Sequence, residues 1–161
     1  MANDVLNTQM KEVADFFVGK FQADSDVLFA KELSRENLDY SLDSLKEVDR
    51  WLSILAKDEV DPNKQNSAET IIWTGAYVGE VIRKCSQQEY NWQRYDDAMK
   101  GQSDDIKNII PSTFGTQFML TTTHKGFTLP INKVIRFLAE GPENSLHFYA
   151  GGYCDAKEKM K

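Results

Sequence analysis

The segment Thr70–Lys84, with the sequence TIIWTGAYVGEVIRK, constrains the fold of this chain more than any other. Between Ile71 and Ile82 nearly every residue is apolar or small, on all sides of a helix, and Glu80 carries the only charge. A helix that is apolar all round is buried in a protein core. It is too short to span a bilayer, which takes about 20 apolar residues. We therefore predict a buried central helix over Thr70–Lys84.

Two glycines in this helix predict close packing. Gly75 and Gly79 lie four residues apart on one face, with Ala76 beside them. Because glycine in a helix is less stable than alanine by about 1 kcal/mol, a compensating close approach of another backbone is expected there. Asn66 or Ser67 is expected to cap the first turn.

Hydrophobic periodicity predicts helices on both sides of the central one. The clearest is amphipathic and runs from Leu42 to Lys57, with Ser41 as its N-cap. A polar loop with Pro62 and Asn63 follows, so this helix is expected to be an antiparallel neighbour of the central helix. The other predicted helices are Thr8–Ala23, a short piece over Val27–Leu33, one from Pro130 to just before Gly141, and one from about Asn144.

Strand patterns are confined to the second half of the chain. Residues Tyr90–Tyr95 alternate aromatic and polar side chains, and Gln117–Thr123 is rich in strand-forming residues. The HKGF sequence is expected to turn the chain into a short strand over Phe127–Leu129, whereas Asp96–Ser112 is expected to be a loop. We predict one α+β domain over residues 1–161, with helices packed around the central helix and a small antiparallel sheet of about three strands.

The charge and the cysteines bear on partners and location. A formal net charge of −6 argues against binding to nucleic acid or to an anionic membrane, and it favours a basic partner. The first residues lack the basic and apolar regions of a signal peptide, so a cytoplasmic location is predicted. Cys85 and Cys154 lie far apart in sequence and form no CxxC motif, so two reduced thiols are expected.

Glu80 is the first candidate for a functional residue. A carboxylate in an apolar helix is costly unless it is paired, and Arg83 and Lys84 follow at ion-pair spacing. Glu80 could act as a general base or bind a ligand, together with Tyr77 and Arg83 in a pocket beside the glycine face. The interpretation we favour is a buried structural carboxylate paired with Arg83.

The other chemistry-bearing residues form no convergent pattern. Trp92 and Tyr95 are expected to be the most exposed aromatic pair, whereas the remaining aromatic residues are expected in the core. Asp39, Asp43 and Asp49 lack the spacing of a metal-binding loop, and His124 and His147 are isolated. No phosphate-binding glycine motif is present. We therefore predict no catalytic residue, no cofactor and no metal.

Several segments between Leu38 and Ala150 recur together in a known pattern. They are LDYSLDSLKEVDRWLSIL, WTGAYVGEVIRK, the tryptophan strand YNWQRY, and LPINKVIRFLAEGPENSLHFYA. This pattern resembles a family of small, functionally uncharacterised bacterial proteins, in which an LDxS helix precedes a GxYxGE helix and a tryptophan strand. The resemblance implies a compact α+β domain and no catalytic residue.

The expected function is therefore binding rather than catalysis. We expect a non-enzymatic cytoplasmic interaction protein, such as an immunity protein that binds a bacterial toxin through an acidic and aromatic surface. The toxin-antidote idea is an analogy with other small acidic bacterial proteins. The alternative is a small enzyme or ligand-binding protein that uses Glu80. The sequence does not predict an oligomeric state.

Overall fold

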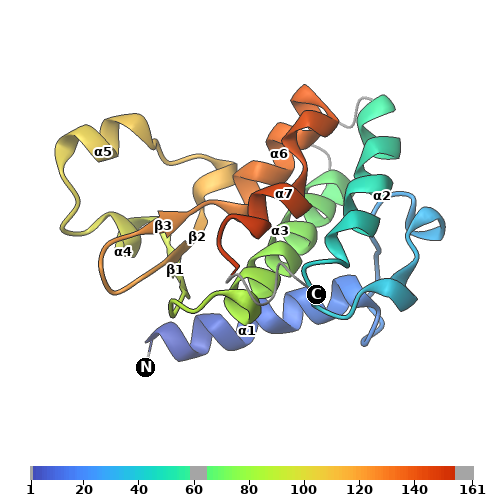
Figure 1. The fold of residues 1–161 in the computed structure, drawn as a ribbon, viewed down its shortest axis with the longest axis horizontal. Helices are drawn as coiled ribbons and strands as arrows, with labels where there is room; N and C mark the ends of the chain where they lie inside the picture. Colours follow the sequence, from blue (N-terminus) through green and yellow to red (C-terminus); the bar gives the residue numbers. More distant parts are fainter. Residues whose placement is uncertain (1, 59–64, 155–161) are drawn as a thin grey trace.

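The computed structural model describes residues 2–58 and 65–154 (Figure 1). In chain order the α-helices are α1 (Ala2–Val18), α2 (Leu45–Lys57), α3 (Gln65–Cys85), α4 (Tyr95–Met99), α5 (Asp104–Ile109), α6 (Pro130–Glu140) and α7 (Leu146–Gly151). The strands are β1 (Asn91–Arg94), β2 (Phe118–Thr121) and β3 (Phe127–Thr128). Short 3-10 helices are η1 (Ala30–Glu32), η2 (Arg35–Asn37), η3 (Phe114–Thr116) and η4 (Pro142–Asn144).

Helix α3 lies at the centre of the fold, as predicted. It packs against α1 on one side and α6 on another, and its residues from Thr74 to Ile82 are all buried. Figure 1 shows α1 crossing beneath α3, with α5 at one end of the molecule and α2 at the other. The α+β class is confirmed.

The three strands form one antiparallel sheet in the order β1-β2-β3, which confirms the predicted sheet. Trp92 pairs with Leu120, and Leu120 in turn pairs with Thr128. Because side chains alternate between the faces of a strand, this register places Trp92 and Leu120 on the same inner face. Both side chains are fully buried in the main core.

The glycines of α3 allow that core to close. A Cβ atom built on Gly75 would lie 2.8 Å from the Cα atom of Ile131 in α6, so a backbone does approach there, as predicted. A Cβ atom on Gly79 would lie 2.1 Å from Cζ2 of Trp92, so the neighbour at this position is an indole ring rather than a backbone.

Several predicted boundaries are wrong for local reasons. Helix α1 ends at Val18, because Gly19 adopts a φ of 92° and Lys20 N donates to Asp15 O. Helix α3 begins at Gln65, so Asn66 and Ser67 lie within its first turn instead of capping it. The short helix predicted over Val27–Leu33 is reduced to η1.

The predicted loop over Asp96–Ser112 contains two short helices, α4 and α5. The hydroxyl of Ser103 accepts a hydrogen bond from Ile106 N and so caps α5, and acidic residues occupy the first turn of each helix, where they complement the helix dipole. These helices were not predicted because they are short: five or six residues are too few to show a helical period of apolar residues.

Helix α2 is not the antiparallel neighbour of α3 that the sequence predicts. It packs mainly against α6 and α7, which come from the C-terminal third of the chain. The loop predicted around Pro62 and Asn63 lies outside the described residues. Ser41 does accept a hydrogen bond from Ser44 N at 3.1 Å, in the turn that leads into α2.

The prediction of two reduced thiols is wrong, because Cys85 and Cys154 form a disulfide. The bond joins the last residue of α3 to the segment after α7, across 69 positions of sequence. At its other end α7 is held by Asp49 of α2, whose carboxylate accepts hydrogen bonds from Ser145 Oγ at 2.6 Å and Leu146 N at 2.7 Å. Helix α7 is thus fastened to the core at both ends.

Candidate functional site

Glu80 is a residue of α3 whose side chain contacts β1, and it is only 7% exposed. Its carboxylate accepts hydrogen bonds from Arg83 Nη1, at 3.2 and 3.0 Å, and from the indole N–H of Trp92 at 2.9 Å. Arg83 also donates from Nε to Tyr90 O at 3.0 Å. Both carboxylate oxygens are therefore engaged by donors that join the helix to the strand.

A recess of 430 Å³ lies beside this cluster, lined by Lys11, Tyr40, Glu80, Arg83 and Lys84. Tyr40 has a φ of 66°, its ring lies 4.2 Å from Lys11 Nζ, and its hydroxyl donates to Asp15 at 2.5 Å. Burial, and then the bond to Asp15, raise the pKa of Tyr40. The recess brings Glu80 and Arg83 to one place, but the Glu80 carboxylate already accepts three hydrogen bonds from Arg83 and Trp92.

Tyr77 does not line that recess. It is fully buried, its hydroxyl lies 2.6 Å from Ser44 Oγ, and it accepts a hydrogen bond from Tyr40 N at 3.0 Å. Burial raises the pKa of Tyr77 to about 12. Its hydroxyl thus fixes the chain before α2 against α3.

Trp92 and Tyr95 do not form an exposed pair. Trp92 is fully buried, because the alternation of β1 places it on the inner face, so that prediction is wrong. Tyr95 is half-buried, and its hydroxyl donates to Ile110 O at 2.5 Å. It packs in a smaller core cluster with Ala98, Met99 and Met119.

We expect Glu80→Gln to reduce the free energy of unfolding by about 2 kcal/mol, because the charge that holds Arg83 and the Trp92 N–H is lost. Chemical denaturation monitored by circular dichroism measures this loss. The exposed Glu89→Gln serves as the control and should change stability by less than about 0.5 kcal/mol. Equal stabilities of the two variants would contradict the structural role of Glu80.

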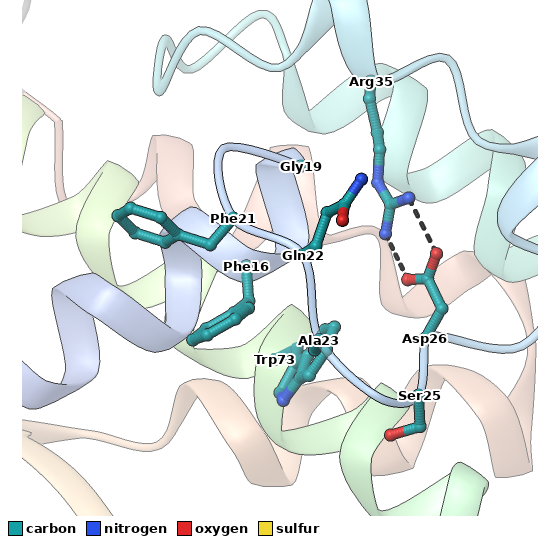
Figure 2. Close-up of a pocket in the computed structure, with 9 residues that line it drawn as sticks. All are labelled: Phe16, Gly19, Phe21, Gln22, Ala23, Ser25, Asp26, Arg35 and Trp73. Carbon is teal, nitrogen blue, oxygen red and sulfur yellow. Dashed lines mark hydrogen bonds and ion pairs between the residues drawn. The ribbon is translucent and has the colours of Figure 1, made fainter.

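A pocket of 340 Å³ lies at the C-terminal end of α1, and we call it the aromatic pocket (Figure 2). Its lining residues are Phe16, Gly19, Phe21, Gln22, Ala23, Ser25, Asp26, Arg35 and Trp73. Phe16 lies between Phe21 and Trp73, with ring centroids 5.5 and 5.6 Å away. Figure 2 shows these rings on one side of the chain segment 19–25 and the Asp26–Arg35 ion pair on the other.

The loop wall of the aromatic pocket is held by polar contacts. The guanidinium of Arg35 donates to both carboxylate oxygens of Asp26 and from Nε to Phe17 O at 2.9 Å. These hydrogen bonds from Arg35 lower the pKa of Asp26. The hydroxyl of Ser25 donates to Glu69, one helical turn before Trp73 on α3. The pocket thus combines residues from the predicted helix Thr8–Ala23, from the segment that follows it and from the central helix, and none of them was predicted as a site residue.

A second recess, of 510 Å³, is rich in carboxylates, and we call it the acidic recess. It is lined by Glu36, Asn37, Asp39, Ser41, Asp43, Ser44, Lys46, Glu47 and Arg50. Asp43 pairs with Lys46 and Glu47 pairs with Arg50, whereas Glu36 and Asp39 form no ion pair with the residues that the structure describes. Hydrogen bonds from Ser41 lower the pKa of Asp39. This recess therefore keeps unbalanced negative charge.

Within residues 2–58 and 65–154, no group of three or more His, Cys, Asp or Glu side chains is placed to hold a metal ion. Over the same part of the chain, no helix combines the length and apolar character needed to cross a bilayer. His124 lies exposed in the turn between β2 and β3.

No protein-family model matches the chain, and neither a curated protein nor a solved structure matches it. The resemblance of its LDxS and GxYxGE segments to small bacterial proteins stays a prediction.

Proposed function

We propose that this chain is a non-enzymatic interaction protein of the immunity type, which binds a basic region of a protein toxin. The observation that carries the proposal is that the aromatic pocket and the acidic recess adjoin. Consecutive residues of η2 line them, since Arg35 faces the first and Glu36 the second. Around η2 the chain therefore carries aromatic side chains and, next to them in sequence, two carboxylates, Glu36 and Asp39, that form no ion pair with the described residues.

This combination suits a protein partner of positive charge. Aromatic residues contribute strongly to binding at protein interfaces, and complementary charge speeds association. Phe21 is 50% exposed, although its ring is apolar and lies against Phe16. The net charge of −6 adds a long-range attraction for a basic partner.

The alternative, an enzyme or ligand-binding protein that uses Glu80, has less support. A general base needs a carboxylate that can reach a substrate proton. Glu80 is buried and accepts hydrogen bonds from Arg83 and from the indole N–H of Trp92, and Tyr77 lies outside the adjacent recess. The chemistry that this alternative requires would first have to break the core contacts between α3 and β1.

The disulfide counts against the cytoplasmic location that the sequence predicts. Structural disulfides are rare in reducing compartments and persist in the periplasm or outside the cell. The bond between Cys85 and Cys154 therefore favours action in an oxidising compartment, where an immunity protein would meet a toxin that arrives from outside.

The test is binding to the product of the neighbouring gene in the source genome, if that gene encodes a toxin domain. We expect Glu36→Lys combined with Asp39→Lys to weaken binding at least tenfold, mainly through slower association, because like charges then face the basic partner. Surface plasmon resonance at 50 and 300 mM salt measures both the loss and its screening.

The control carries the same change of charge elsewhere. Asp105→Lys on α5 with Glu89→Lys before β1 alters exposed carboxylates outside both recesses. It should weaken binding less than threefold. Equal losses in the two double variants would contradict a specific role for the acidic recess, and a neighbouring gene for a metabolic enzyme would count against the immunity function.

A further inference from the structure

The aromatic pocket contains a half-buried tryptophan whose polar group is unused. Trp73 stacks on Phe16 with an interplanar angle of 30°, and its indole N–H donates no hydrogen bond to the described part of the chain. The other two tryptophans, Trp51 and Trp92, are fully buried, and each donates its indole N–H, to Phe29 O and to Glu80. Trp73 is thus the tryptophan that a ligand in this pocket would contact.

The charged residues that line the pocket, Asp26 and Arg35, balance each other, and Glu69 lies just outside the lining, where Ser25 of the pocket wall donates to it. The carboxylate of Asp26 is neutralised by the two hydrogen bonds from Arg35. Glu69 lies one turn before Trp73 on α3, so the two side chains share a face of the helix. It accepts the Ser25 hydroxyl and forms no ion pair within residues 2–58 and 65–154. A positive group over the indole would therefore find an uncompensated carboxylate nearby.

The size of the pocket favours a side chain over a cofactor. Its 340 Å³ lies at the small end of the range of about 300–1,000 Å³ that ligand pockets occupy. A guanidinium is planar, stacks on aromatic faces and is weakly hydrated, so it suits a shallow pocket of this kind better than an ammonium does.

We propose that the aromatic pocket receives an arginine side chain of the protein partner, with the guanidinium stacked on Trp73 and its charge met by Glu69. The inference rests on the proposed function, because it names the group by which a basic partner is anchored. Arg35 does not compete for this position, since its guanidinium is held by Asp26 and Phe17 O.

The test uses the full chain and three small probes, N-acetyl-arginine amide, its neutral isostere N-acetyl-citrulline amide, and N-acetyl-leucine amide. Binding is followed by the change in tryptophan fluorescence, since Trp73 is the tryptophan that lines the pocket, and, independently, by calorimetry. We expect the arginine probe to shift the emission and to bind at least fivefold more tightly than either of the others. Glu69→Gln should remove that preference, and the exposed Glu89→Gln should keep it.

A second variant controls for the possibility that Glu69→Gln impairs folding. Phe21→Ala changes a side chain on an exposed loop and should weaken the arginine probe at least threefold without altering the circular dichroism spectrum. Equal binding of citrulline would overturn the role of charge. Tighter binding of leucine would assign an apolar side chain to the pocket, and the absence of any binding would remove the pocket as an anchor.

The outcomes separate this inference from the proposed function. If the arginine probe fails while the Glu36 and Asp39 reversals still weaken the toxin, only the pocket assignment falls. If the probe binds but the unaltered chain does not bind the toxin, the preference of the pocket for a guanidinium holds and the proposed function falls.

Discussion

Replacement of Gly79 by alanine is expected to lower the free energy of unfolding by about 3 kcal/mol, at the upper end of the range for overpacked cores. The added Cβ atom would lie 2.1 Å from Cζ2 and 2.4 Å from Cη2 of Trp92. The indole cannot move aside easily, because it is fully buried and its N–H is bonded to Glu80. The loss therefore exceeds the gain of about 1 kcal/mol in helix propensity. Denaturant unfolding measures the difference.

Gly151→Ala is the matched control for this prediction. Gly151 is also helical, at the end of α7, but a Cβ atom there would meet only Leu42 Cδ2 at 3.9 Å, which is ordinary contact. Alanine at this position should leave stability unchanged or raise it by up to about 1 kcal/mol. A Gly79→Ala protein as stable as the unaltered chain would show that Trp92 does not pack against α3 as described.

Removal of the disulfide is expected to lower the free energy of unfolding by about 4 kcal/mol, because the bond closes a long loop and so restricts the unfolded chain. The loop spans 69 positions of sequence. Thermal unfolding with and without a reducing agent measures the effect. A loss of this size in a chain of 161 residues corresponds to a fall in Tm of roughly 10 °C.

The double variant Cys85→Ser, Cys154→Ser controls for other effects of the reducing agent. It should unfold at the lower temperature under both conditions, so that the reductant changes the Tm of the unaltered chain alone. Two free thiols found by titration in the denatured, non-reduced protein would contradict the disulfide directly.

The central helix and the sheet could be predicted from sequence because their signals are local. Residues 71–82 are apolar on all sides, and the alternation of YNWQRY marks β1. The ion pair between Glu80 and Arg83 could also be predicted, since Arg83 follows at ion-pair spacing and does bind Glu80. The hydrogen bond between Glu80 and Trp92 could not, because nothing in the spacing of the two residues shows that β1 returns to α3.

The remaining features depend on contacts between distant parts of the chain. Cys85 and Cys154 meet only because α7 ends beside the end of α3. The aromatic pocket likewise forms where α1, the segment that follows α1, and α3 meet. The apolar pattern of α3 alone predicts Trp73 to be a core residue, whereas in the fold it is half-exposed. Periodicity within one helix shows which face is apolar, but not how much of that face a neighbour covers.

The attachment of α7 has a consequence for the order of events during synthesis. Asp49 caps a helix that begins 97 residues later, and Leu146 and Ala150 of that helix fill the core beside α2. During synthesis the face of α2 that packs against α7 therefore stays exposed to solvent until α7 has emerged from the ribosome. Contacts over such separations slow folding. The core beside α2 is therefore expected to be completed only once α7 and Cys154 have been made, when the disulfide can form.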